Sequence, residues 1–97
     1  MRIQLKPSKT LPRSRIFISG KKLLGYAVRY GDRFDFCILD RGLAVLTRSP
    51  TGTTRINGSP AYPSLDLAGK AIARTFLTDY VNVEFAPNQI TITEARE

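Results

Sequence analysis

A chain of 97 residues with 42% hydrophobic content can build one compact domain but not comfortably two, and its formal net charge of +7 points to an anionic partner. The absence of histidine and the presence of a single cysteine, Cys37, exclude histidine-based catalysis, the usual zinc sites and an internal disulfide, so we expect Cys37 to be a half-buried structural thiol. No apolar stretch approaches the roughly 18 residues that cross a bilayer, and we expect a cytoplasmic protein without a membrane partner.

The chain opens with a segment that is either an arm or a strand. Residues 1–12 are basic, and the alternation around Ile3 favours a short extra strand before the first prolines. Residues 15–19 then predict a strand, and Gly20 marks a change of backbone direction. Residues 21–28 place their apolar side chains on one side at helical spacing, which predicts a short helix.

A β-hairpin is predicted next. A Tyr-Gly-Asp-Arg turn over residues 30–33 leads into an alternating strand over 34–39. An Asp-Arg-Gly turn at 40–42 then closes the hairpin onto a strand over 43–47. The first structural unit therefore spans residues 13–48 and has the order strand, helix, strand, strand.

The connection that follows is long for a compact domain. Residues 49–63 are rich in Ser, Thr, Pro and Gly, and Asn57-Gly58 predicts a tight turn. The segment is either a linker or a small protruding hairpin. Arg55 and Tyr62 are weak binding candidates within it.

Residues 64–97 repeat the order of the first unit, with a shorter helix expected. The spacing between the copies is 49 positions before the helix and 47 after it, which pairs Gly20 with Gly69 and Asp32 with Asp79. A unit of this size cannot bury its own hydrophobic face, so two copies are expected to share one core. We therefore predict a single domain over residues 1–97, mostly β with short helices, in which the two repeats share one core.

Three segments of the first unit carry a family resemblance. Arg15-Ile16-Phe17-Ile18-Ser19-Gly20-Lys21-Lys22-Leu23-Leu24, Tyr30-Gly31-Asp32-Arg33-Phe34 and Asp40-Arg41-Gly42-Leu43-Ala44-Val45-Leu46 resemble the AbrB/MazE/SymE-type swapped-hairpin domain, most nearly its SymE-like branch. In that family the hairpins of two chains interleave into one barrel. The resemblance implies that this chain is a fused pseudo-dimer, acting as a monomer or a further homodimer.

The same resemblance implies DNA binding by a transcription regulator or antitoxin, through cations on the first strand and at its exit. The matching positions are Arg13, Arg15, Lys21 and Lys22 in the first unit, with Lys70 and Arg74 in the second. Charge supports this reading independently, because residues 1–29 hold eight basic side chains and no acidic one. Arg29 and Arg55 complete the set of candidate nucleic-acid contacts. The uneven cations of the two units argue against reading of a palindrome.

Two alternatives stay open. The basic segment is also what a solubilising arm with no partner would carry. The protein could also be a small inhibitor, of antitoxin or phage type, whose basic face meets an acidic protein surface. The dispersed carboxylates predict no metal site and no catalytic site, so we expect no cofactor and no enzymatic activity. DNA is favoured over RNA as the polyanion.

Overall fold

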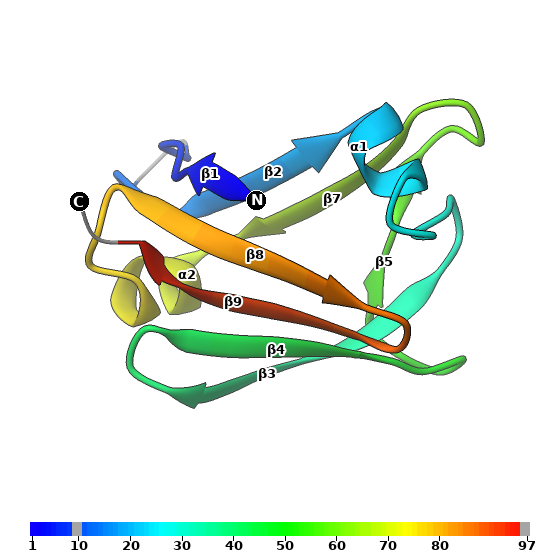
Figure 1. Cartoon of the computed structure of the whole chain (residues 1–97). Coiled ribbons are helices and arrows are strands. Elements are labelled where there is room, and N and C mark those ends of the chain that lie inside the picture. The colour runs from blue at the N-terminus through cyan, green and yellow to red at the C-terminus, as the bar shows by residue number, and fades with distance from the viewer. Residues whose placement is uncertain (9–10, 96–97) are drawn as a thin grey trace.

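The computed structural model describes residues 1–8 and 11–95, and within these ranges strands dominate, as predicted. Residues 9–10 of the expected arm and 96–97 of the expected second unit lie outside the described residues. The described strands form two sheets, accompanied by two short helices, and Figure 1 shows their arrangement. In chain order the elements are β1 (Arg2–Gln4), β2 (Arg15–Ser19), α1 (Lys21–Leu24), β3 (Arg33–Asp40), β4 (Leu43–Arg48), β5 (Thr54–Arg55), β6 (Asn57–Gly58), β7 (Pro63–Ala68), α2 (Lys70–Thr75), β8 (Tyr80–Ala86) and β9 (Gln89–Ala95).

The larger sheet contains both predicted hairpins. Its strand order is β1-β8-β9-β4-β3-β5, so each hairpin keeps its own two strands adjacent. The hairpins meet at its centre, where Ala44 lies opposite Ile92 and Val45 opposite Thr91. Neighbouring strands of a sheet twist relative to one another, and the six strands curl into a half-barrel (Figure 1).

The smaller sheet has the order β2-β7-β6. β2 and β7 run antiparallel, with Phe17 directly opposite Asp66. Along the ladder, the pair of Ile16 and Leu67 comes directly before Phe17 and Asp66, and the pair of Ile18 and Leu65 comes directly after them. Because side chains alternate along a strand, these four aliphatic residues point inward and are buried.

The two sheets are joined at two corners. At the first corner, the chain that follows β1 pairs with the start of β2. The Lys6 amide donates to the Arg15 carbonyl at 2.9 Å, and the Arg15 amide donates to the Lys6 carbonyl at 3.0 Å. At the second corner the chain leaves β5, which pairs with β3, and enters β6, which pairs with β7. Ile56 lies between them with 0% of its surface exposed, so this corner is packed into the core.

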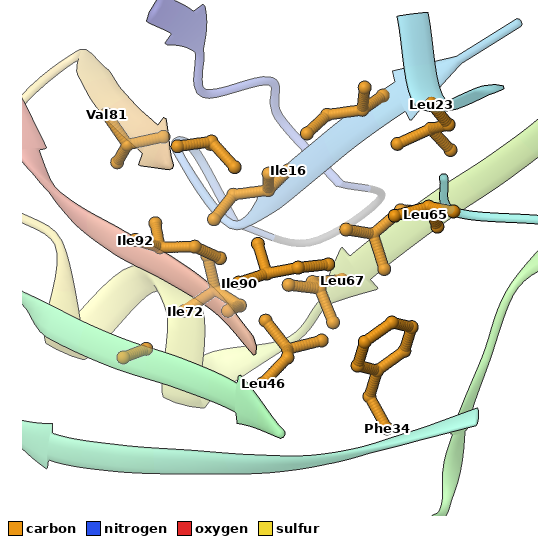
Figure 2. Packing of buried hydrophobic residues seen from close by; sticks show 14 of the residues in the cluster. Ile16, Leu23, Phe34, Leu46, Leu65, Leu67, Ile72, Val81, Ile90 and Ile92 are labelled. Carbon is orange, nitrogen blue, oxygen red and sulfur yellow. The ribbon is translucent and has the colours of Figure 1, made fainter. Parts of the chain in front are cut away.

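One hydrophobic core lies between the sheets. Both sheets and both helices contribute, so neither half of the chain has a separate core (Figure 2). Fully burying an aliphatic or Phe side chain stabilises a fold by about 1.5–3 kcal/mol. The most deeply buried large side chains are Phe34, Phe76, Ile16, Ile18, Leu23, Leu46, Ile56, Leu65, Ile90, Ile92, Val28 and Val81.

The helices depart from prediction in their lengths. α1 ends at Leu24 instead of reaching residue 28, and it is followed by Gly25, whose amide donates to the Lys21 carbonyl at 3.1 Å. Glycine is a poor helix former, and Ala27 already has a positive φ of 60°. The four residues of α1 are fewer than the six of α2, so the expectation that the second helix would be the shorter one is wrong.

Asn57-Gly58 is not the predicted turn. These two residues form β6, and the turn lies at Ser59 to Tyr62, whose amides and carbonyls exchange two hydrogen bonds of 3.1 Å. Gly58 is needed there for another reason, since it has φ +87° and a Cβ on it would lie 2.3 Å from the Tyr62 carbonyl oxygen. Residues 54–58 thus link the two sheets.

Cys37 is exposed, which corrects the expectation of a half-buried thiol. It lies on β3 opposite Val45. Because Phe34 points into the core, the alternation along the strand turns Cys37 to the outside.

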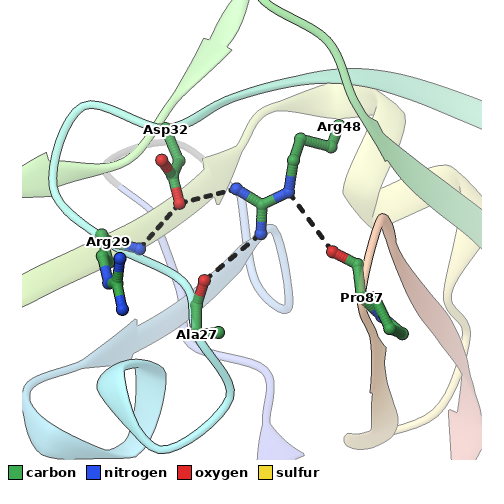
Figure 3. Close-up of polar contacts among 5 residues, drawn as sticks. All are labelled: Ala27, Arg29, Asp32, Arg48 and Pro87. Atoms are coloured by element: carbon green, nitrogen blue, oxygen red, sulfur yellow. Dashed lines mark hydrogen bonds and ion pairs between the residues drawn. The ribbon is translucent and has the colours of Figure 1, made fainter.

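Arg48, at the end of β4, forms hydrogen bonds with three separate segments of the chain (Figure 3). Its Nη1 donates to Asp32 Oδ2 at 2.8 Å, and its other nitrogens donate to the carbonyls of Ala27 and Pro87, each at 3.3 Å. The Arg29 amide also donates to Asp32 Oδ2, at 2.9 Å. Partial burial alone would raise the pKa of Asp32, but these two hydrogen bonds and the charge of Arg48 outweigh it and lower the pKa.

Candidate nucleic-acid interface

Most of the candidate nucleic-acid contacts lie on the outer face of the smaller sheet or just beyond the ends of its strands. Alternation along β2 and β7 turns every second side chain outward, away from the core. Phe17 remains 38% exposed at its centre, although it is a large apolar side chain. We define the outer face by the residues Arg15, Phe17, Ser19, Ser64, Asp66 and Ala68.

Exposed cations stand at both ends of the outer face. Lys21 and Lys22 open α1 directly beyond β2, and Lys70 opens α2 directly beyond β7, with Arg74 one turn later. None of these four side chains has a carboxylate within ion-pair distance among residues 1–8 and 11–95. They are therefore available to an external anion.

The two helices begin at opposite ends of the ladder because β2 and β7 are antiparallel. The Gly20 amide donates to the Pro63 carbonyl at 2.8 Å at one end, and the Gly69 amide donates to the Ser14 carbonyl at 3.0 Å at the other. Residues 63 and 69 are six steps apart along β7, and at about 3.3 Å per residue the ends are roughly 20 Å apart. The outer face is thus flanked by two separate cationic sites.

Arg15 lies on the outer face but is already paired. Its Nε and Nη2 each donate to a carboxylate oxygen of Asp66 at 2.9 Å, and its guanidinium lies over the Phe17 ring at 4.8 Å. The pKa of Arg15 is raised, first by the hydrogen bond to Asp66 and second by the negative charge of Asp66. Asp66 therefore offsets the positive charge at the centre of the outer face.

The other three candidates are not on the outer face. Arg13 has its Nε 4.0 Å from the exposed carboxylate of Asp79. Arg29 belongs to the turn fastened by Asp32, and Arg55 lies over the Tyr30 ring at 5.2 Å. Of the eight candidates, Arg15 therefore lies on the outer face, Lys21, Lys22, Lys70 and Arg74 lie in the helices that follow its two strands, and Arg13, Arg29 and Arg55 lie elsewhere.

Two residues of the outer face and one neighbouring residue were not predicted from the sequence. Phe17 and Asp66 form its centre, and the only available signal was their equivalence at the 49-residue spacing. Lys6 is exposed and lies beside Arg15 through the backbone bridge, a contact that the sequence does not signal. Tyr62, the aromatic candidate, lies in the turn after β6 and is 62% exposed.

The described residues hold no group of three or more His, Cys, Asp or Glu side chains placed to bind a metal ion. Neither helix in the described part of the chain has the length and hydrophobicity to cross a membrane. Comparison of the chain with protein-family models, with curated proteins and with solved structures finds no match.

Proposed function

We propose that this protein is a non-enzymatic nucleic-acid-binding protein, most simply a DNA-binding regulator or antitoxin. One observation carries the proposal: four exposed cations, with no carboxylate partner among the described residues, flank a single two-stranded ladder, two at each end. Cations of this kind bind phosphates by releasing condensed counterions, and they need no base contact. The separation of roughly 20 Å between the ends corresponds to about six base-pair steps of 3.4 Å along a DNA duplex.

We infer further that the chain is a fused pseudo-dimer of the swapped-hairpin type. The strand registers support this inference. At a spacing of 49, residue 17 is equivalent to residue 66, and these two residues pair directly. At a spacing of 47, Ala44 and Val45 are equivalent to Thr91 and Ile92, and they pair crosswise. One approximate two-fold rotation would therefore relate both ladders.

The proposed rotation does not preserve the chemistry of the outer face. It exchanges Phe17 with Asp66, and the position equivalent to Lys22 is Ala71. A reader of palindromic DNA presents the same side chains to two half-sites. We therefore propose binding that depends on the phosphate backbone and has little sequence preference.

The test is binding to a mixed-sequence DNA duplex and to a single strand, measured by fluorescence anisotropy between about 50 and 200 mM salt. The test variant replaces Lys21, Lys22, Lys70 and Arg74 by Ala. A control variant removes the same charge elsewhere by replacing Arg29, Arg33, Arg41 and Arg55. Each lost phosphate contact lowers the slope of log affinity against log salt by about 0.9, so the test variant should lose roughly 3 to 4 units of slope.

The control separates a site from net charge alone. If both variants lose affinity equally, the cations at the ends of the outer face are not a site. If the wild type binds neither nucleic acid at the lowest salt concentration, the proposal fails and the protein-binding inhibitor becomes the better explanation.

A further inference from the structure

A groove lies between β3 and β7, where the two sheets do not join. It has a volume of about 440 Å³, within the range of ligand sites, and its lining includes Phe36, Asp66 and Ile72. β5 pairs with β3 only at residues 33–34, and β6 pairs with β7 only at 63–64. Among the described strand pairings, the remainder of both edges facing the groove has no partner strand.

The free edge of β3 presents hydrogen-bonding groups at alternate residues. The Arg33 carbonyl accepts from the Ser49 amide, which lies on the β4 side. Backbone groups alternate in direction along an antiparallel strand, so those of Asp35 and Cys37 also face β4. The N–H and C=O groups of Phe36 and Ile38 therefore face the free edge. A bulge between residues 38 and 40 ends this edge.

The free edge of β7 also presents backbone hydrogen-bonding groups to the groove at alternate residues. The Gly20 amide donates to the Pro63 carbonyl and the Gly69 amide donates to the Ser14 carbonyl, so the odd-numbered residues of β7 face β2. The backbone groups of Asp66 and Ala68 consequently face the groove. A single extended chain lying in the groove would meet unpaired donors and acceptors at strand spacing on β3, on β7 or on both.

The groove also leaves apolar surface uncovered. Ile38 lies opposite Ala44, whose side chain is fully buried on the inner face of the larger sheet. Ile38 shares that inner face, yet it remains 40% exposed. Phe36, two residues earlier, is partly buried and lines the groove. Alternate side chains of an added strand could pack on this surface.

The charge of the lining selects among extended ligands. Arg55 lines the groove, and the acidic residue among the described lining residues, Asp66, is held by Arg15 in a bidentate ion pair. α2, which supplies Ala71 and Ile72 to the lining, also carries Lys70 and Arg74, which have no ion-pair partner in the described part of the chain. An acidic ligand is therefore favoured over a basic one.

We propose that the groove between β3 and β7 binds an extended acidic segment of a partner protein, which adds a strand to the free edge of β3. The ladder hydrogen bonds supply affinity, and the cations around the groove select acidic side chains. The groove shares Asp66 and Ala68 with the outer face and lies near the same cations, Lys70 and Arg74, but its binding groups are backbone groups at the free edges of β3 and β7. Protection of those edge amides therefore tests this proposal separately from nucleic-acid binding.

The test uses the ¹⁵N-labelled full-length protein and an acetylated octapeptide of alternating Val and Glu as the probe. Addition of the probe should shift the amide resonances of Phe36 and Ile38 and slow their hydrogen exchange at least tenfold. The amides of Asp35 and Cys37 already face β4, and their exchange should change little. A Val and Lys octapeptide and an eight-nucleotide single strand serve as competing probes.

Ile38→Pro is the decisive variant, because proline removes one of the two amides that face the free edge and none of the amides that face β4. It should weaken binding of the acidic octapeptide about tenfold or more, whereas Ile38→Val should bind like the wild type. If the proline variant does not fold, alternate N-methylation of the probe blocks the same hydrogen bonds and should abolish binding by the wild type.

Three results would overturn the proposal. One is the absence of binding by the acidic octapeptide. A second is binding that Ile38→Pro and the N-methylated probe leave unchanged. The third is stronger protection of the Phe36 and Ile38 amides by the single strand than by the peptide, which would make the groove a nucleic-acid site.

Discussion

Replacing Arg48 by Ala should destabilise the protein more than any other single change of a basic residue to Ala. The side chain holds the turn containing Asp32, the carbonyl of Ala27 and the turn at Pro87 together, and it lies over the Phe34 ring at 5.1 Å. The side chains of Arg48 and Asp32 are only 30% and 26% exposed. Truncation would therefore leave a partly buried carboxylate with one charged hydrogen bond fewer.

The expected magnitude follows from these contacts. Hydrogen bonds to charged groups contribute about 1.5–3 kcal/mol, and exposed ion pairs about 0–1 kcal/mol. The partly buried Arg48–Asp32 pair falls between these ranges, and truncation also removes the hydrogen bonds to the Ala27 and Pro87 carbonyls, so we expect a total loss of about 2 kcal/mol in the free energy of unfolding. For a domain of this size, that loss lowers the Tm by about 8–16 °C.

Thermal and urea unfolding of Arg48→Ala, Asp32→Asn and the double variant would measure this loss and the coupling between the two residues. Arg41→Ala is the control, because Arg41 is exposed in the β3–β4 turn and should change stability by less than about 0.5 kcal/mol. Equal stability of Arg48→Ala and Arg41→Ala, or simple additivity of Arg48→Ala and Asp32→Asn, would contradict a structural role of the Arg48–Asp32 pair.

The same pair predicts a pH dependence. The folded-state pKa of Asp32 is lowered, so its contribution to stability is fully present above the unfolded pKa of about 3.9. That contribution is lost as the pH falls from there through the lowered pKa. The stability difference between the wild type and Arg48→Ala should therefore shrink below about pH 4 and stay constant between about pH 5 and 7.

Other changes test separate parts of the structure. A chain of residues 1–63 should not unfold cooperatively as a monomer by circular dichroism, because it lacks β7, β8 and β9; a stable monomer of that length would end the pseudo-dimer proposal. Gly58→Ala should lower the free energy of unfolding in urea by more than about 2 kcal/mol, and Gly31→Ala by only about 1 kcal/mol. Both glycines have a positive φ, but of these two only residue 58 would place a Cβ against backbone atoms, so equal losses would contradict this explanation. Asp66→Asn should strengthen DNA binding and steepen its salt dependence by about one contact, since it releases Arg15; weaker binding would exclude the outer face.

The strands were predictable because their signal is local. The alternation over residues 15–19 matches β2, and the hairpin predicted at 34–47 is present as β3 and β4. The end of α1 was less predictable, because a single glycine decided it against continued apolar spacing. Asn57-Gly58 was misassigned because a nearby strand, β7, provided a pairing that the local turn preference does not reveal.

The candidate site was only partly predictable for a physical reason. Lys21 and Lys70 could be located because they follow glycines at the ends of predicted strands. The pairing of Arg15 with Asp66 joins residues 51 positions apart, and only the register of β2 on β7 determines it. The role of Arg48 is of the same kind, since its three partners come from separate turns.

The most direct test of the central claim is to map a bound DNA duplex on the ¹⁵N-labelled protein by amide chemical shifts at low salt. If the outer face binds the duplex, the amides of Lys21 and Lys22 at one end and of Lys70 and Arg74 at the other should shift together along one binding curve. Changes in amide chemical shift that are confined to one end, or that occur on β8 and β9 while the outer face is unchanged, would contradict the proposed interface.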